Sequence, residues 1–194
     1  MKLSLKIFIA CIVVFGFSGC NTDSIYQEEQ YKTLVYLLSG SDNVFATSYT
    51  LNEDEPVRYV SIGCGGSNSN EQDITVTLEP YPEMLDKYNS LNYDYQSEYA
   101  KLLPADRYEI ESYSVTLPAK SNYHYARLPI KVRPLGLSPD SLYFIPLRIK
   151  SVSRYDVNEE KRDVLFRVAI ENDYAEQLVP TYYVKSGSMT NPIT

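Results

Sequence analysis

Cys20 is the residue of this chain whose chemistry is best defined by its surroundings. It follows two small residues (SGC, positions 18–20) and an apolar run from Ile7 to Phe17, with Lys2 and Lys6 before that run. The run is about half of the ~20 residues that a membrane-spanning helix needs, so it is typical of a secretory signal peptide. Small residues give a lipoprotein signal peptidase access to the backbone, and the thiol accepts a diacylglycerol as a thioether. The sequence therefore predicts lipidation at Cys20.

This prediction divides the beginning of the chain into a signal peptide (residues 1–19) and a polar tether (residues 20–29). Several acyl chains on one cysteine hold a protein at a membrane far more firmly than a single chain does. Phe17 departs from the usual pattern, in which Leu stands three positions before the cysteine. The alternative is an ordinary signal peptide followed by an incidental cysteine.

The two other cysteines offer little chemistry. Cys11 leaves with the signal peptide, so Cys64 has no partner for a disulfide. A catalytic thiol would need a nearby histidine, and the chain has only His124. We predict no Cys64–His124 dyad, because Cys64 lies in SIGCGG, a context typical of a small residue at the end of a strand.

Charge and motifs narrow the function classes. The chain has 18 basic and 25 acidic residues, and loss of Lys2 and Lys6 leaves a formal charge of −9 on the remainder. This balance argues against nucleic acid as a partner. No GxSxG, HExxH, P-loop or dinucleotide motif occurs, and one histidine does not build a histidine-rich metal site. The acids of residues 52–55 are typical of solvated loop charge. We predict a protein that is not an enzyme and has neither a cofactor nor a metal; a pair of glycosidase carboxylates brought together by folding stays open.

Tyrosine is the most unusual component, with 19 Tyr, 6 Phe and no Trp. Tyrosine rings can stack on the faces of sugars, while their hydroxyls bond sugar oxygens. The segment NYDYQSEY (residues 92–99) lacks an apolar period, so Tyr93, Asp94, Tyr95 and Gln96 are the candidate carbohydrate-binding residues. The alternative is that the tyrosines serve strand formation and core packing, which is the commoner role of Tyr. The absence of Trp weakens the carbohydrate interpretation.

Short runs with a period of two dominate residues 30–171, and turn-forming residues separate them. They predict eight strands, over residues 31–38, 44–51, 57–62, 73–79, 114–117, 126–132, 143–149 and 164–170. Residues 82–91 instead predict a short helix, because Pro82 and early acids precede apolar residues at helical spacing. The pattern favours an all-β, immunoglobulin-like antiparallel β-sandwich with one short helical crossover. Residues 172–194 form a tail that begins a further apolar run (TYYVKSG). This tail either adds an edge strand to the sandwich or begins a truncated second domain, and we favour the second interpretation.

Five motifs occur in a fixed order within residues 88–152. They are YN (88–89), LLPADRYEI (102–110), SVTLPAKS (114–121), LPIKV (128–132) and LSPDSLYFIPLRIKS (137–151). This set resembles the N-terminal domain of unknown function that follows the lipidated cysteine in many outer-membrane lipoproteins of the Bacteroidetes. The resemblance covers about residues 30–170.

The resemblance implies an immunoglobulin-like sandwich without agreed catalytic residues. The family occurs in Sus-type surface glycan-binding lipoproteins and ahead of family-18 glycosidase barrels. Its markers Pro104 and Pro146 look structural, and Pro146 within a strand predicts an edge strand or a bulge. The tether of this chain lacks the dense acidic run of surface-exported lipoproteins, with only Asp23, Glu28 and Glu29. Surface display is thus an expectation from the family, and the periplasmic face of the outer membrane stays open.

Three functions follow as hypotheses. The first is a non-catalytic, lipid-anchored outer-membrane domain that supports glycan capture in a polysaccharide-utilisation system, by weak binding or as a spacer. Its partners would be the membrane, a polysaccharide or oligosaccharide, and an outer-membrane glycan transporter complex. The second is an accessory N-terminal module of a glycoside hydrolase, and the third is a structural or adhesive sandwich protein. We favour the first.

Overall fold

A computed structural model describes residues 31–66, 70–120 and 125–171 of the 194-residue chain. The chain divides into two compact units, residues 1–32 and residues 33–194, and the elements below belong to the second unit. Cys20, His124 and the tail 172–194 lie outside the described residues. The predictions made for them therefore stay predictions.

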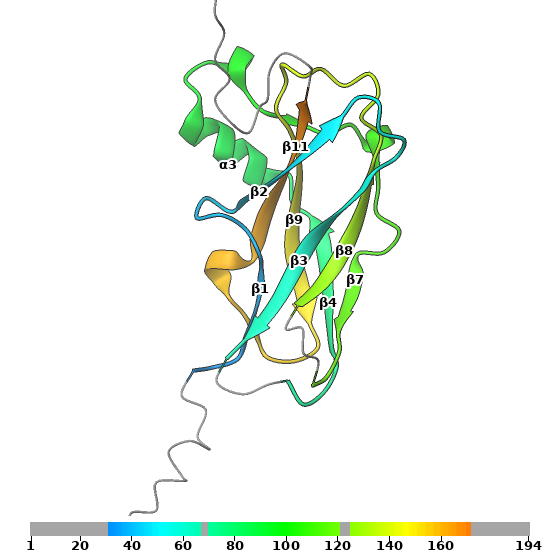
Figure 1. The fold of residues 1–194 in the computed structure, drawn as a ribbon. Helices are drawn as coiled ribbons and strands as arrows, with labels where there is room; N and C mark the ends of the chain where they lie inside the picture. The colour runs from blue at the N-terminus through cyan, green and yellow to red at the C-terminus, as the bar shows by residue number, and fades with distance from the viewer. Residues whose placement is uncertain (1–30, 67–69, 121–124, 172–194) are drawn as a thin grey trace, which may run out of the picture. The chain divides into compact units, whose positions relative to one another are not determined.

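Two β-sheets form the domain, as Figure 1 shows. The five-stranded sheet has the order β10 (Asp156–Val157), β1 (Leu34–Leu37), β3 (Val57–Gly65), β8 (Tyr125–Val132) and β6 (Tyr108–Glu109). The six-stranded sheet contains β2 (Val44–Thr50), β11 (Asp163–Glu171), β9 (Tyr143–Val152), β4 (Ile74–Pro80) and β7 (Ser114–Leu117), in that order, with β5 (Lys101–Leu102) beside the start of β9. Short 3₁₀ helices η1 (Gln96–Glu98), η2 (Ala105–Arg107) and η3 (Glu159–Lys161) lie in the connections. The predicted all-β sandwich is confirmed.

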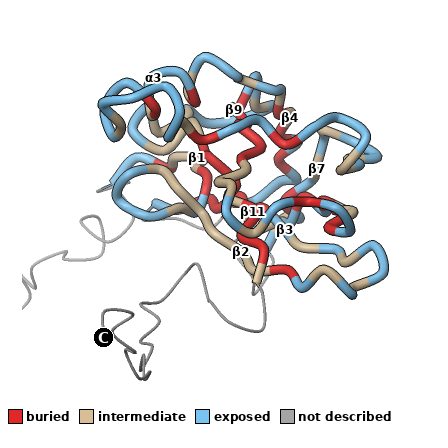
Figure 2. Tube along the Cα trace, turned by 90° about the horizontal axis from the view of Figure 1, so that it is seen from above, coloured by how far each residue is buried: buried red, intermediate tan, exposed pale blue. Residues whose placement is uncertain are grey.

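The core lies between the two sheets and follows the predicted period of two. Ile74, Val76 and Leu78 of β4 are buried, and Thr75 and Thr77 between them point the other way. The residues of β8, β9 and β11 that face this core also lie two positions apart (Leu128, Ile130, Val132, Leu147, Ile149, Val164, Phe166 and Val168). β9 and β11 in addition bury Phe144 and Leu165, which face the other side of the sheet. Figure 2 shows buried segments gathered in the middle of the domain, with exposed loops around them. Apolar burial on this period is what holds the two sheets together.

Most neighbouring strands are antiparallel, and the exceptions concern the strands at the sheet edges. β1 pairs antiparallel with β3, but β2 pairs parallel with β11 over seven residues, from Val44 beside Leu165 to Thr50 beside Glu171. β1 and β2 thus belong to different sheets although only a short turn separates them. Asn43 in that turn has a φ of 60°, a left-handed conformation that Asn adopts more readily than most residues. β10 and β5 also make parallel pairs, with β1 and β9. These two strands and β6 have only two residues each, too few for a period-two signal in the sequence.

The helix α3 (Glu83–Asn92) lies where a short helix is predicted, in the connection from β4 to β5 of the six-stranded sheet, and the chain passes to the five-stranded sheet after β5. Pro82 precedes it with a φ of −61°, which suits the start of a helix. Glu83 and Asp86 in its first turn stabilise the helix because their negative charges interact favourably with the positive end of the helix dipole. It ends at Asn92, where the backbone of Tyr93 turns to an extended conformation. No helix in the described part of the chain is long and apolar enough to span a membrane.

The prediction that Pro146 marks an edge strand or bulge is wrong. Pro146 is buried in β9, which lies between β11 and β4. The register shift against β4 falls four residues further along β9, where Thr77 pairs with Ser151 and Leu78 with Ile149, so that Lys150 is the extra residue. One side of β9 pairs with β5 at residues 143–144 and with β4 from residue 147 onward. Pro146 sits where this flank passes from β5 to β4, and its carbonyl accepts a hydrogen bond from Tyr81 N at 3.1 Å. A local gap between two neighbours therefore accommodates the missing N–H of a proline in a central strand.

Candidate functional site

Helix α3 covers part of the outer face of the six-stranded sheet, against β9 and β11. Leu85 of the helix, Ala100, Phe144 of β9 and Leu165 of β11 form a small second core there, separate from the one between the sheets. Met84, Tyr88 and Tyr93 pack around it. This burial fixes the helix on the sheet and determines which helical residues face the strands.

An aromatic chain extends from this second core toward the surface. The Tyr88 ring lies 5.2 Å from Phe144 and 6.2 Å from Tyr93, centre to centre, and Tyr93 lies 6.3 Å from Tyr99. Tilted and edge-on pairs at these distances are the favourable geometry for aromatic rings. Burial raises the pKa of Tyr88, and its hydrogen bond with the Tyr93 side chain acts in the same direction.

The four residues predicted to bind carbohydrate fall at the end of this chain of rings. Tyr93 is half-buried between Tyr88 and Tyr99, whereas Asp94, Tyr95 and Gln96 are exposed, with 68% of Tyr95 accessible to solvent. The structure therefore divides the set: Tyr93 belongs to the packing of α3, and Tyr95 extends from the loop. Whether any of the four contacts a sugar stays a prediction.

Asn89, half of the YN motif, holds the loop that carries these residues. It is 5% exposed, its Nδ2 donates to the carbonyl of Ala100 at 2.9 Å, and its Oδ1 accepts from Ala100 N at 2.9 Å. The Asn89 side chain thus satisfies both the backbone N–H and the carbonyl of Ala100, and it holds the end of the loop 93–99 against α3. The asparagine of the YN motif therefore has a structural role.

A groove of about 350 Å³ runs beside α3. The helix supplies one wall, and the other comes from the turn before β2 and from β9 and β11. Its lining residues are Asp42, Asn43, Tyr81, Glu83, Met84, Lys87, Tyr88, Leu91, Asn92, Arg148, Asp163 and Leu165. Leu91, at the open side, is 73% exposed. The groove therefore combines two tyrosines with carboxylates, amides and cations, which is the composition expected of a site for a polar ligand with apolar faces.

Arg148 is the most firmly held side chain of the groove. Its Nε and Nη2 donate to the two carboxylate oxygens of Asp163 at 2.6 and 2.7 Å, and its guanidinium carbon lies 3.3 Å from the centre of the Tyr81 ring. The hydrogen bonds to Asp163 raise the pKa of Arg148, so the side chain is a permanent cation. A bidentate pair stacked on a ring is rigid, and a rigid group loses little entropy when a ligand binds to it.

The sequence prediction missed this groove. Arg148 lies between Leu147 and Ile149 of the last motif, and Asp163 directly precedes the strand predicted over residues 164–170. The sequence pointed to one lining residue of the groove, because Tyr88 belongs to the YN motif. The pairing of β9 with β11 decides that Arg148 and Asp163 lie side by side, and no local pattern shows it.

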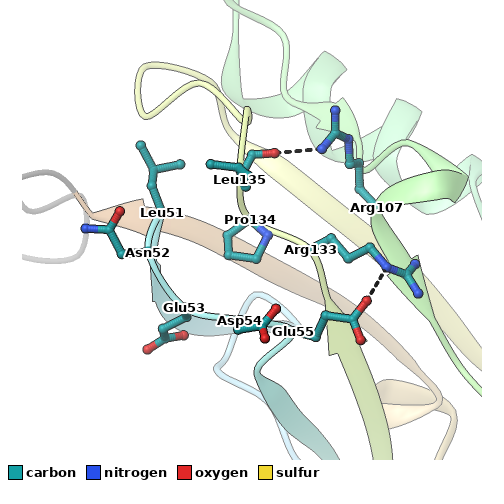
Figure 3. A pocket seen from close by; sticks show the side chains of 9 residues that line it. All are labelled: Leu51, Asn52, Glu53, Asp54, Glu55, Arg107, Arg133, Pro134 and Leu135. Atoms are coloured by element: carbon teal, nitrogen blue, oxygen red, sulfur yellow. Dashed lines mark hydrogen bonds and ion pairs between the residues drawn. The ribbon is translucent and has the colours of Figure 1, made fainter.

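A second cavity, a cleft of about 500 Å³, opens at the end of the sandwich where β2 and β8 finish (Figure 3). Residues 51–55 form one wall, and Arg107 with residues 133–135 form the other. Arg133 Nε donates to Glu55 Oε1 at 2.7 Å, and Arg107 Nη1 donates to the carbonyl of Leu135 at 2.6 Å. The acids of this loop are therefore not simply solvated: the hydrogen bond from Arg133 holds the pKa of Glu55 below its usual value. A carboxylate kept ionised in this way does not serve as a general acid near neutral pH.

The described residues give no support to metal or thiol chemistry. Across residues 31–66, 70–120 and 125–171, no three His, Cys, Asp or Glu side chains gather into a group that could hold a metal ion. Cys64 is a buried residue near the end of β3, as predicted, and burial raises the pKa of its thiol. A raised pKa keeps a thiol protonated and unreactive.

A family model described as "-like, N-terminal domain" matches residues 26–156, about two thirds of the chain. The chain belongs to this family of N-terminal domains. The family match covers all five motifs completely, and it confirms the family resemblance based on them. No curated protein matches the sequence.

Solved structures from Bacteroides share the fold of this domain. A Bacteroides ovatus protein of unknown function matches with a TM-score of 0.61 at 22% identity, over 73% of this chain and 48% of that one. A multidomain Bacteroides ovatus protein that includes DUF1735 matches with a TM-score of 0.58 at 21% identity, over 72% and 46%. An auxiliary nutrient binding protein of Bacteroides thetaiotaomicron matches with a TM-score of 0.53 at 16% identity, over 71% and 48%. The chain spans about half the length of these proteins, and the likeness establishes the fold.

Proposed function

We propose that this domain is a non-catalytic part of a lipid-anchored outer-membrane protein that captures glycans, and that the α3 groove contacts the sugar. The observation that carries the proposal is that Tyr81, Tyr88 and the Arg148–Asp163 pair line one groove. Tyrosine rings offer apolar faces to sugar C–H groups, while a fixed guanidinium and carboxylate bond hydroxyl groups in set directions. The shared fold of a nutrient binding protein supports a role in nutrient capture.

The charges of the groove favour a neutral glycan. Asp163 already pairs with Arg148, so that cation has little attraction left for a sulfate or a uronate. The other charged lining residues are Asp42, Glu83 and Lys87, which together carry a net negative charge. An anionic polysaccharide would therefore meet weak repulsion along the groove.

Affinity electrophoresis tests the proposal. Residues 20–194, with Cys20→Ser for solubility, migrate through native gels that each contain one neutral or one acidic polysaccharide. We expect at least one neutral polysaccharide to retard the protein, and Leu91→Asp to reduce the retardation because Leu91 lies at the open side of the groove. Leu102→Asp is the matched control, since Leu102 is an exposed leucine of β5 outside the groove.

Two other outcomes would revise the proposal. If Leu91→Asp has no effect but Tyr95→Ala, at an exposed residue, abolishes retardation, the loop and not the groove binds the glycan. If no gel retards the protein, the domain does not bind glycan itself. Its remaining role would then be that of a spacer for a binding partner.

Anchoring through Cys20 is the second part of the proposal. A protein labelled with a clickable fatty acid in a Bacteroides host should carry the label, and Cys20→Ala should remove it and release the protein from the membrane fraction. Protease added to intact cells then distinguishes the cell surface from the periplasmic face. Copurification of a glycan transporter with the intact lipoprotein tests that partner.

A further inference from the structure

The outer face of the five-stranded sheet carries tyrosine rings in place of the polar side chains that usually cover a solvated sheet face. β1, β3 and β8 lie side by side in this sheet (Figure 1), and their outward residues meet in cross-strand rows. The rows consist of Tyr36, Gly63 and Tyr125, of Leu38, Ser61 and Arg127, and of Tyr59 and Pro129. We refer to these residues as the tyrosine face. None of them is acidic, so the face itself offers no negative charge to a ligand.

Glycines of β3 make room for the Tyr36 ring on the surface of the sheet. A Cβ atom at Gly63 would lie 2.8 Å from Cε2 and Cζ of that ring, which is closer than side chains pack, and one at Gly65 would lie 3.5 Å from Cε1. The ring therefore covers Gly63, and Tyr125 pairs with the same glycine from the neighbouring strand. Tyr59 and Tyr125 stay 42% and 36% exposed, which leaves ring surface available to a ligand.

A pocket of about 340 Å³ continues the tyrosine face at the edge of β1. β10 pairs with β1 only at Leu34 and Val35, so the rest of that edge has no neighbouring strand within the described residues. The pocket is lined by Tyr36, Leu37, Leu38, Ser39, Asn158 and Lys161. Its lining includes hydroxyl, amide and ammonium groups but no carboxylate. The surface open to a ligand thus extends from Tyr59 to this pocket.

Arg127 stands between two rings of the tyrosine face. Its guanidinium carbon lies 5.6 Å from the centre of the Tyr59 ring and 5.2 Å from that of Tyr125, and its Nη2 donates to Tyr125 Oη at 3.3 Å. Across the described part of the chain no carboxylate pairs with Arg127. Five other arginines each have such a partner: Arg58, Arg107, Arg133, Arg148 and Arg162. Because a guanidinium presents several donors in a fixed fork, the remaining N–H groups of Arg127 can bind a carboxylate from outside the domain.

We propose that the tyrosine face binds a polysaccharide that contains uronic acids. A sugar carboxylate accepts hydrogen bonds from Arg127, and the neighbouring sugar rings lie on Tyr59 and Tyr125. The chain has a formal net charge of −7, which repels a polyanion in general, so such binding requires a local surface like this one. The tyrosine face lies on the other sheet from the α3 groove, and it takes an acidic glycan where the groove takes a neutral one. Each site therefore stands or fails independently of the other.

Affinity electrophoresis of the full chain in a non-ionic detergent tests this proposal, in gels that contain polygalacturonate, alginate or hyaluronate. We expect at least one of these acidic polysaccharides to retard the protein. Arg127→Gln should weaken that binding at least about tenfold, because hydrogen bonds to charged groups are the strong ones. Arg154→Gln is the matched control, since Arg154 is an exposed arginine between β9 and β10, outside the tyrosine face.

Two further variants separate the tyrosine face from the α3 groove. Tyr59→Ala should weaken the retardation by acidic polysaccharides, and Leu91→Asp should leave it unchanged because Leu91 lies at the open side of the groove. The methyl ester of the retarding polysaccharide should retard the Leu91→Asp protein less than the free acid does, since esterification removes the charge. Urea titration checks that each variant keeps its fold.

No retardation by any of the three acidic polysaccharides overturns the proposal. So does equal retardation of the Arg127→Gln and Arg154→Gln variants, or of the Leu91→Asp protein by the free acid and its methyl ester. Loss of retardation in Leu91→Asp alone would place the acidic glycan in the α3 groove, and it also overturns the proposal. Retardation by acidic polysaccharides without any by neutral ones supports this proposal and refutes the one for the groove.

Discussion

The guanidinium carbon of Arg148 lies 3.3 Å from the centre of the Tyr81 ring, in a stack that joins a central strand of the sheet to the segment leading into α3. Asp163, on the neighbouring strand, fixes the other side of the guanidinium through two hydrogen bonds. The groove beside α3 therefore has a rigid floor made from three separate segments of the chain. The stability of the domain and glycan binding in the groove should therefore both depend on the contacts of Arg148 with Tyr81 and Asp163.

Arg148→Ala should lower the free energy of unfolding by about 1–3 kcal/mol, because it leaves the half-buried Asp163 without its bidentate partner. Urea titration measures the loss. Lys150→Ala is the matched control on the same strand: Lys150 pairs with Glu79 at 3.3 Å in an exposed position, where ion pairs contribute under about 1 kcal/mol. Equal losses in the two variants would contradict the special role of Arg148.

Asn89→Ala should lower the free energy of unfolding by about 2–4 kcal/mol, because both the N–H and the carbonyl of Ala100 lose their partner in a buried place. Asn92→Ala, in the next turn of the helix, removes an exposed hydrogen bond to the Tyr88 carbonyl and should cost under about 1 kcal/mol. Thermal unfolding of both variants checks the difference. If Asn89→Ala were as stable as Asn92→Ala, the YN motif would need another explanation.

Tyr93 and Tyr95 should respond differently to truncation. Tyr93→Ala removes a ring that packs on Tyr88 and Tyr99, so we expect a loss of about 1–3 kcal/mol of stability. Tyr95→Ala, at a residue 68% exposed, should change stability by under about 0.5 kcal/mol. Chemical denaturation measures both values. Only Tyr95→Ala then reports on glycan binding without a change in the fold, and a large loss of stability from it would show that its ring packs on the domain.

Tyr49 should make the domain sensitive to alkaline pH. The side chain is 1% exposed, and burial raises its pKa from 10.0 to about 12, while the guanidinium of Arg58 lies 5.1 Å from the ring centre. Below about pH 9 both the folded and the unfolded state keep the proton, so Tyr49 adds no pH dependence there. Between about pH 10 and 12 only the folded state keeps it, and the free energy of unfolding falls by about 1.4 kcal/mol per pH unit.

Urea titrations from pH 8 to pH 11 of the unsubstituted protein and of Tyr49→Phe check this prediction. The phenylalanine variant keeps the ring but lacks the ionisable group, so its stability should fall less steeply above pH 10. Burial also raises the pKa of Tyr88 and Tyr113, and the comparison of the two proteins removes their shared contribution. Parallel curves would mean that Tyr49 ionises as readily in the folded state as in the unfolded chain.

The sequence by itself determined the elements whose signals are local. The alternation of Ile74, Val76 and Leu78 places β4 because side chains of a strand point alternately to its two faces. Pro82 and the acids after it place the start of α3 because they suit the first turn of a helix. The ordered motifs identified the family, and the family model covers all five of them.

Only the tertiary structure decided what depends on neighbours distant in sequence. Pro146 is tolerated in a central strand because β5 and β4 leave a gap beside it, and a single strand does not show what flanks it. Arg148 and Asp163 meet because β9 and β11 pair in one register, which brings together residues fifteen positions apart. The candidate glycan groove follows from this pairing and from the packing of α3. Burial between residues distant in sequence, and not a local sequence pattern, determines both the pairing of β9 with β11 and the packing of α3.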